Sequence, residues 1–185
     1  MTRVIVARHA EPDRVSGLDR TKWPLTRFGR AQAEHLAGRL ADLAPLNVVS
    51  GPAVRTKETA ELAAKRLRRP VKVDPRFGDI LAPKGEDTDA WLASIFNSDA
   101  PVHWRDLDAA VNRWRNDTVQ AVRELTEDAV VFTQYTNINA IAAAALRVEV
   151  TKVCRPDFAS ITEFSVVNGD VRMVIDGRDV VGPNA

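Results

Sequence analysis

The sequence predicts a single α/β domain over residues 1–185, a three-layer α/β/α sandwich around a mostly parallel sheet. Short β-branched runs alternate with helical stripes of apolar residues, as in parallel sheets covered by helices on both faces. Asn168–Gly169 indicates a hairpin near the end of the chain. Residues 82–101 break the alternation, which favours an inserted helical flap.

The first half of the chain carries three expected strands and two helices. Arg3–Ala7 is a short β-branched run that is expected to form a buried strand. Asn47–Ser50 is expected to form a second strand, and Val71–Val73 a brief third one. Thr26 is an expected N-cap for the first helix. The apolar stripes of the two helices are Ala33, Leu36, Ala37 and Leu40, then Ala60, Ala63, Ala64 and Leu67.

The second half begins with the expected flap, which is bounded by Pro83 and Pro101. Ala129–Thr133 predicts a fourth strand, and Ser160–Ile175 predicts two strands joined by the hairpin turn. One long helix is expected before the fourth strand, with the stripe Leu107, Ala110, Val111, Trp114, Thr118, Ala121, Val122 and Leu125. A further helix follows that strand, with the stripe Ile138, Ile141, Ala142 and Ala145.

Composition excludes several classes of protein. Twenty-six basic and 25 acidic side chains give a net charge of +1, which argues against a nucleic-acid binder or a protein of acidic membranes. One cysteine permits no internal disulfide, as expected in a reducing compartment. No apolar run approaches the roughly 18 residues of a membrane span, and the first apolar stretch is too short for a signal peptide. A cytoplasmic protein is therefore expected.

Charged side chains follow the ends of the expected strands. In a parallel sheet the ligand lies beyond the carboxyl ends of the strands, so these side chains are expected to converge on one crevice. Two guanidinium groups and a helix start suit a phosphate dianion, and a nearby imidazole can attack phosphorus. The residues at these ends are Arg8, His9, Glu11, Arg55, Asp79 and Gln134.

Several ordered segments resemble the signature of the histidine phosphatase superfamily, the phosphoglycerate mutase-like proteins. Arg8–His9 follows the first strand, as in that family. Leu25–Ala33 is similar to its LTxxGxxQA segment, and Ser50–Ala60 is similar to its SPxxRxxxTA segment. Val130–Ile141 and Ser160–Thr162 occupy the places of its last core strand and helix and of its closing strand.

The resemblance implies a role for each strand-end residue. His9 would be the nucleophile that becomes phosphorylated, and Arg8 and Arg55 would bind the phosphoryl oxygens. Asp79 stands where the family often has the glutamate that protonates the leaving group, and Glu11 is a second candidate for that acid. No metal or other cofactor is implied.

The sequence departs from the family where a second histidine is expected. Gln134 occupies that position, and Tyr135 stands where glycine usually follows. A glutamine amide donates a hydrogen bond but carries no positive charge. Loss of one such transition-state contact typically lowers the rate by on the order of 100- to 1000-fold. Val15 replaces an asparagine that contacts phosphate in many members, which makes mutase activity a weaker expectation than hydrolysis.

The predicted function is hydrolysis of phosphomonoesters through a phosphohistidine on His9, attenuated by Gln134 and independent of metal. The alternative is a non-catalytic protein that binds phosphate or a phosphoprotein. The expected partner is a phosphorylated small molecule or a phosphoprotein, with no nucleic acid and no membrane. Neither a GxGxxG nor a GxxxxGK[ST] segment is present, so nucleotide-binding loops are not supported.

Overall fold

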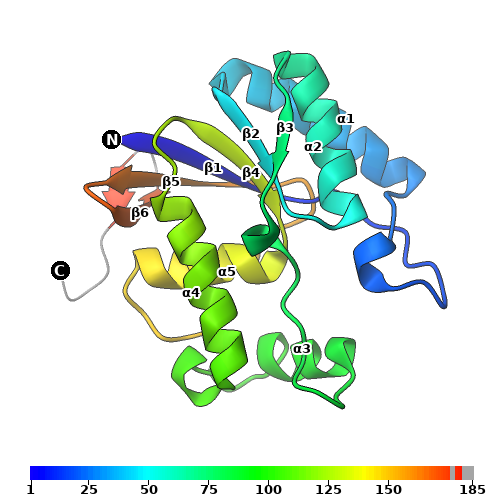
Figure 1. Cartoon of the computed structure of the whole chain (residues 1–185), viewed down its shortest axis with the longest axis vertical. Helices are drawn as coiled ribbons and strands as arrows, with labels where there is room; N and C mark the ends of the chain where they lie inside the picture. The colour runs from blue at the N-terminus through cyan, green and yellow to red at the C-terminus, as the bar shows by residue number, and fades with distance from the viewer. Residues whose placement is uncertain (176–177, 181–185) are drawn as a thin grey trace.

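A seven-stranded sheet forms the centre of the molecule (Figure 1). The computed structural model describes residues 1–175 and 178–180. Within them the strands lie in the order β3-β2-β4-β1-β5-β6-β7. Their bounds are β1 (Thr2–Arg8), β2 (Asn47–Ser50), β3 (Val71–Val73), β4 (Ala129–Thr133), β5 (Ile161–Val167), β6 (Asp170–Ile175) and β7 (Arg178–Val180).

The sheet is parallel on one side and antiparallel on the other. Strands β3, β2, β4 and β1 are parallel neighbours, while β5 runs antiparallel to β1, and β6 and β7 continue that antiparallel part. The predicted α/β class with a C-terminal hairpin is confirmed. The antiparallel part is wider than the hairpin alone, because β7 pairs with β6 and extends the sheet by one strand.

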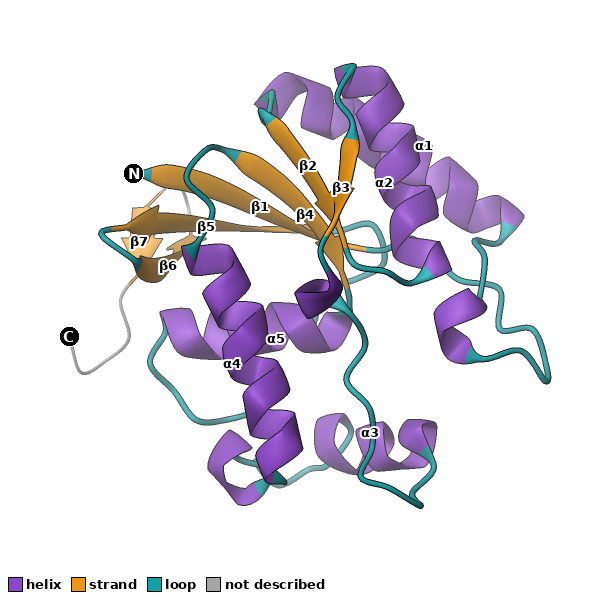
Figure 2. Cartoon of the chain, viewed as in Figure 1, coloured by secondary structure: helices purple, strands orange, loops and turns teal. Residues whose placement is uncertain are grey.

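Helices cover both faces of the sheet (Figure 2). The α-helices are α1 (Arg27–Leu43), α2 (Val54–Leu67), α3 (Thr88–Phe96), α4 (Ala109–Arg123) and α5 (Tyr135–Ala145). Alternate side chains of β1 point to opposite faces, as strand geometry requires. Ile5 packs in a core with residues of α1 and α2, and Val6 packs in a second core with residues of α4 and α5.

Close backbone approaches hold the site-bearing loops against the helices. Thr26 caps α1 by accepting a hydrogen bond of 2.8 Å from the Gly29 amide. A Cβ atom added to Gly29 would lie 2.2 Å from the Glu11 carbonyl oxygen, and one added to Gly51 would lie 2.2 Å from the Phe77 carbonyl oxygen. Real Cβ atoms do not approach that closely, so both glycines are required by the packing of neighbouring loops.

The hairpin and the long helix differ from the sequence prediction only at their edges. Asn168 and Gly169 have φ angles of 54° and 80°, as a two-residue hairpin turn of this type requires. The helix α4 begins at Ala109 rather than at the start of the apolar stripe, because Asp108 caps it. A short 3₁₀ helix, η3 (Trp104–Asp106), precedes it.

Residues 82–101 contain α3 and no strand. Figure 1 shows α3 away from the sheet, below α4 and α5. Its Ile95 and Phe96 pack in a third apolar cluster that includes Trp104 of η3 and Val111 of α4. This cluster anchors the segment beside the carboxyl-end side of the sheet.

No helix in the described residues is long and apolar enough to cross a bilayer.

Candidate active site

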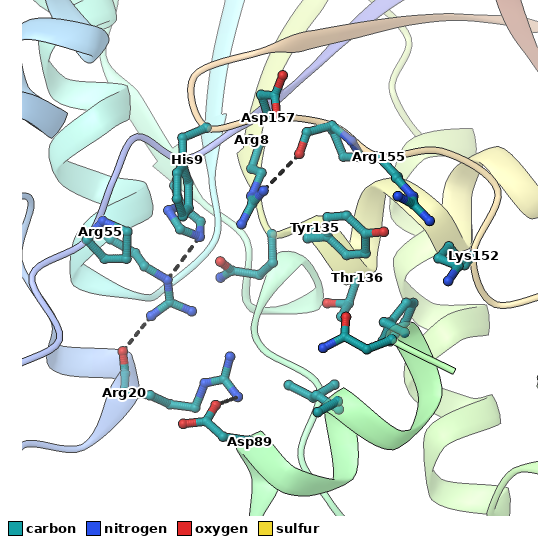
Figure 3. A pocket seen from close by; sticks show the side chains of 18 of the residues that line it. Arg8, His9, Arg20, Arg55, Asp89, Tyr135, Thr136, Lys152, Arg155 and Asp157 are labelled. Atoms are coloured by element: carbon teal, nitrogen blue, oxygen red, sulfur yellow. Dashed lines mark hydrogen bonds and ion pairs between the residues drawn. The ribbon is translucent and has the colours of Figure 1, made fainter. Parts of the chain in front are cut away.

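A cleft of about 720 Å³ lies beyond the carboxyl ends of β1 and β4 (Figure 3). Its walls are the residues after those two strands, the loop with the 3₁₀ helix η1 (Arg20–Lys22), one face of α3 and residues 152–158. Three aspartates and a larger number of cations line it, so the cleft is electropositive. The cations are Arg8, Arg14, Arg20, Arg55, Lys152 and Arg155.

His9 follows β1 and is 5% exposed. Its Nδ1 lies 2.8 Å from the Ala10 carbonyl oxygen, which can only accept, so Nδ1 carries the proton. Its Nε2 accepts a hydrogen bond of 3.2 Å from Arg55 Nε, which can only donate. Both contacts require the same tautomer, and they place the lone pair on Nε2.

The imidazole of His9 is held neutral. Its pKa is lowered well below 6.5, first by burial and then by the positive charge of Arg55, with a smaller contribution from Arg8. A neutral ring retains a nucleophilic Nε2 at physiological pH.

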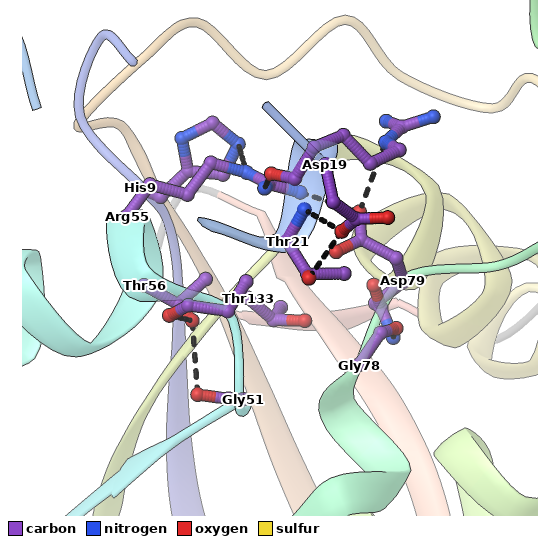
Figure 4. Close-up of polar contacts among 12 residues, drawn as sticks. His9, Asp19, Thr21, Gly51, Arg55, Thr56, Gly78, Asp79 and Thr133 are labelled. Atoms are coloured by element: carbon purple, nitrogen blue, oxygen red, sulfur yellow. Dashed lines mark hydrogen bonds and ion pairs between the residues drawn. The ribbon is translucent and has the colours of Figure 1, made fainter. Parts of the chain in front are cut away.

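Arg55 lies in the first turn of α2 and is 2% exposed. Besides its contact with His9, it donates from Nη1 to the Arg20 carbonyl oxygen and from Nη2 to Asp79 Oδ1 (Figure 4). Burial lowers its pKa, and the charge of Asp79 opposes that effect. Two of its nitrogens are thus fixed by the protein, and the third points at His9.

Arg8 reaches the cleft beside His9 (Figure 3). Its Nη1 donates to the Pro156 carbonyl oxygen at 2.8 Å, and its guanidinium lies 4.0 Å from the centre of the Phe158 ring. Its Nε is buried without a partner among the described residues. Burial lowers the pKa of Arg8 to about 10, so the group is still a cation at neutral pH.

The two candidate acids, Asp79 and Glu11, do not line the cleft themselves. Asp79 lies behind Arg55, with Oδ1 paired to Arg55 and 3.7 Å from Arg20 Nε. Its Oδ2 is buried and has no partner among the described residues. Glu11 accepts a hydrogen bond of 2.7 Å from the Thr26 hydroxyl, so its carboxylate is directed to the start of α1.

Gln134 is the residue between β4 and α5, lines the cleft and is 4% exposed. Its amide nitrogen and its amide oxygen are both buried without a partner among the described residues. Such unpaired buried groups are rare and costly, which marks this side chain as one that a ligand can satisfy. Tyr135, which follows it, also lines the cleft.

Sequence reasoning missed the contributions of Arg20, Lys152 and Arg155. Arg20 lies in an irregular loop and joins the site by pairing with Asp79 and with Asp89 of α3 at 3.2 Å. Lys152 and Arg155 precede β5, which runs antiparallel to β1. The rule for carboxyl ends of parallel strands therefore does not select them, and only the clustering of basic residues before the closing strand signals them.

The model of the histidine phosphatase superfamily (branch 1) matches residues 4–175, which include every site residue described above. The chain belongs to the histidine phosphatase superfamily. Among the described residues, no group of three histidine, cysteine, aspartate or glutamate side chains is placed to hold a metal ion.

One curated relative is "Probable phosphoglycerate mutase GpmB" of Proteus mirabilis. It is 28% identical over an alignment of 111 residues, and the match covers 52% of this chain and 51% of the relative. The chain thus matches about half the length of that curated protein.

Several solved structures share the fold of this chain over nearly their whole length. A mycobacterial glucosyl-3-phosphoglycerate phosphatase in complex with inorganic phosphate has a TM-score of 0.68 at 22% identity, covering 96% of this chain and 98% of that one. Phosphoserine phosphatase of Entamoeba histolytica, in complex with 3-phosphoglyceric acid, has a TM-score of 0.70 at 19% identity, covering 95% and 96%. YhfR of Bacillus stearothermophilus has a TM-score of 0.72 at 22% identity, covering 96% and 97%.

Proposed function

We propose that this protein hydrolyses phosphomonoesters through a phosphohistidine on His9. The observation that carries the proposal is the orientation of the His9 ring. Two hydrogen bonds, to the Ala10 carbonyl and from Arg55, fix the tautomer whose lone pair is on Nε2, beside an electropositive cleft. A phosphoryl group takes the place of the Arg55 N–H on that lone pair when Nε2 attacks phosphorus. Membership of the superfamily and its phosphatase members support the same activity.

The proposed reaction has two steps. In the first, His9 Nε2 attacks phosphorus, the N–P bond forms, and the bond to the ester oxygen breaks as that oxygen takes a proton from an acid. In the second, water attacks phosphorus and gives a proton to the conjugate base of that acid, the N–P bond breaks, and inorganic phosphate leaves. Neither step involves electron transfer, and water is the only reactant besides the ester.

Arg8 and Arg55 stabilise the transferring phosphoryl group. Phosphoryl oxygens become the principal negative charge in the cleft, and fixed guanidinium groups stabilise such charge without reorganising. Arg55 is already held by Asp79 and by the Arg20 carbonyl, while Arg8 keeps an unpartnered Nε. Both cations are therefore preorganised on the side of the cleft where His9 lies.

Asp79 is the better of the two candidates for the acid. It is joined to His9 through Arg55, and its Oδ2 has no partner among the described residues. The Glu11 carboxylate instead accepts a hydrogen bond from the Thr26 hydroxyl, at the start of α1. Asp79 can act as the proton donor or can only position Arg55, and the two roles predict different responses to the leaving group.

Gln134 is proposed to attenuate turnover. Its neutral amide stands where the family has a second histidine, and it can donate to a phosphoryl oxygen without adding charge. The alternative function, binding of a phosphate group without turnover, rests on the same residue. Phosphate contacts from Arg8 and Arg55 would persist, whereas transition-state stabilisation would weaken.

A steady-state assay with an aryl phosphate tests the proposal. The wild-type protein should release phosphate, also in the presence of a chelator, and His9→Ala should abolish release. His35→Ala is the matched control, because His35 is an exposed histidine on α1 outside the cleft. Phosphate binding with no release above the His9→Ala background would favour the non-catalytic alternative.

A further inference from the structure

The cleft extends well beyond the phosphoryl group that His9 would accept. Its volume of about 720 Å³ lies in the range of about 300–1,000 Å³ typical of sites for whole small molecules. The part of the cleft remote from His9 is therefore positioned to hold the leaving group of the ester, and its lining should reveal the chemistry of that group.

Two cations lie at the remote part of the cleft. Figure 3 shows Lys152 and Arg155 on the far side of Tyr135 from His9 and Arg55. Lys152 is half-buried, and its ammonium group donates to the Ser98 carbonyl at 3.2 Å. Within residues 1–175, neither Lys152 nor Arg155 forms an ion pair. Arg155 is exposed, as are the two acidic residues of the lining nearest in sequence to these contacts, Asp99 at the end of the flap and Asp157.

The ring of Tyr135 separates these cations from the phosphoryl end. One side of Tyr135 meets Arg8, whose guanidinium carbon lies 5.4 Å from the ring centre. The Phe96 ring of α3 packs edge-on against Tyr135 at 5.6 Å between centroids. The hydroxyl end of Tyr135 is directed toward Lys152 and Arg155 (Figure 3). An apolar wall thus connects the two cationic ends of the cleft.

We infer that Lys152 and Arg155 form a second anion subsite, which selects phosphomonoesters whose leaving group carries a carboxylate or phosphate on the far side of Tyr135 from the transferred phosphoryl group. The inference rests on the proposed function for the phosphoryl end. Cations that line a cleft and form no ion pair attract an anionic ligand, and a guanidinium pairs with both carboxylate and phosphate.

Non-hydrolysable phosphonates test the subsite without requiring turnover. Calorimetry at low ionic strength should give a Kd for para-carboxybenzylphosphonate about fivefold lower than for its neutral isostere para-carbamoylbenzylphosphonate, as expected for one solvent-accessible ion pair. Para-xylylenebisphosphonate tests whether phosphate is preferred to carboxylate at the far end. Phosphonoacetate, whose two anionic groups are too close to pass Tyr135, serves as the short probe.

The double variant Lys152→Gln/Arg155→Gln should bring the carboxylate-to-carboxamide ratio of Kd values close to one. Glutamine at position 152 retains a donor for the Ser98 carbonyl. Lys72→Gln/Arg105→Gln is the matched control, because it removes the same charge from two exposed residues outside the cleft. The control should keep the fivefold preference, and the Kd of phosphonoacetate should be similar in the two double variants.

Three results would overturn the subsite: a ratio near one in the wild-type protein, a ratio unchanged by the double variant, or an equal loss in the charge-matched control. Failure of the hydrolase proposal is a separate result. It would appear as an absence of phosphate release from aryl phosphates while the fivefold preference among the phosphonates persists.

Discussion

The protonation state of His9, the proposed nucleophile, is set by burial and by the charges around it. His9 is 5% exposed and accepts from Arg55, and both features lower its pKa, burial first. Neutral His9 is therefore the form that the fold stabilises. Any variant that admits water to this position should raise the pKa of the His9 ring toward its ordinary value.

Because the pKa of folded His9 lies well below 6.5, the unfolded chain binds the His9 proton first as pH falls. This site therefore contributes stability above about pH 6.5 that is progressively lost as pH falls toward the folded pKa. Denaturant unfolding at pH 7.5 and at pH 5.5 should show a larger decrease in the free energy of unfolding for wild type than for His9→Gln. Equal decreases would contradict the assignment of a buried neutral ring.

The proposed attenuation by Gln134 predicts a gain of function. Gln134→His with Tyr135→Gly restores the family residues and the room for an imidazole, and kcat should rise by about one to three decades. The inhibition constant of inorganic phosphate should change little, because Arg8 and Arg55 supply the ground-state contacts. A flat kcat in a variant that still requires His9 would show that Gln134 is not the limiting residue.

In the proposed mechanism, Asp79 is either the acid or the residue that positions Arg55. If it is the acid, Asp79→Asn should lower kcat/KM strongly for an alkyl phosphate and little for an aryl phosphate whose leaving group needs no proton. If it only holds Arg55, both substrates should be affected equally. Glu11→Gln is the matched comparison, and a larger leaving-group dependence there would move the acid to Glu11.

The loop after β1 packs so closely against α1 that the contacting residue of the helix, Gly29, has no room for a side chain. On α1, a Cβ atom at Gly29 would meet the Glu11 carbonyl oxygen at 2.2 Å, whereas one at Gly38 would meet nothing within 4 Å. Gly29→Ala should destabilise the protein by roughly 1–3 kcal/mol. Gly38→Ala should stabilise it by up to about 1 kcal/mol, because alanine favours the helix. Thermal unfolding of the pair measures this, and equal shifts would contradict the close approach.

Element boundaries could be predicted where the pattern is strong and unambiguous. The bounds of β2, β3 and β4 match the β-branched runs, and Asn168–Gly169 forms the hairpin turn. The strand β7 was not predicted, because only one of its three residues, Val180, is β-branched. The 3₁₀ helix η1 was not predicted either, because it is set by Asp19 accepting from Thr21 rather than by an apolar stripe.

At the scale of the whole molecule, the parallel sheet explains why distant residues meet. Arg8 is the last residue of β1, and His9 and Gln134 follow β1 and the adjacent β4. Arg55 follows β2, on the other side of β4. Their approach could be anticipated from the strand ends alone. The loop that brings Lys152 and Arg155 to the same cleft could not, because its path depends on packing between the segment after α5 and the flap, as in the contact of Lys152 with Ser98.

The central claim is that His9 carries the phosphoryl group during turnover, and trapping that intermediate tests it most directly. The wild-type protein would be mixed with an aryl phosphate, quenched in base to preserve phosphohistidine, digested, and analysed by mass spectrometry. We predict one phosphoryl group on the peptide that contains His9, present also in His35→Ala and absent from His9→Ala. Phosphate release with no phosphoryl group on His9, or with the group on another residue, would contradict the account.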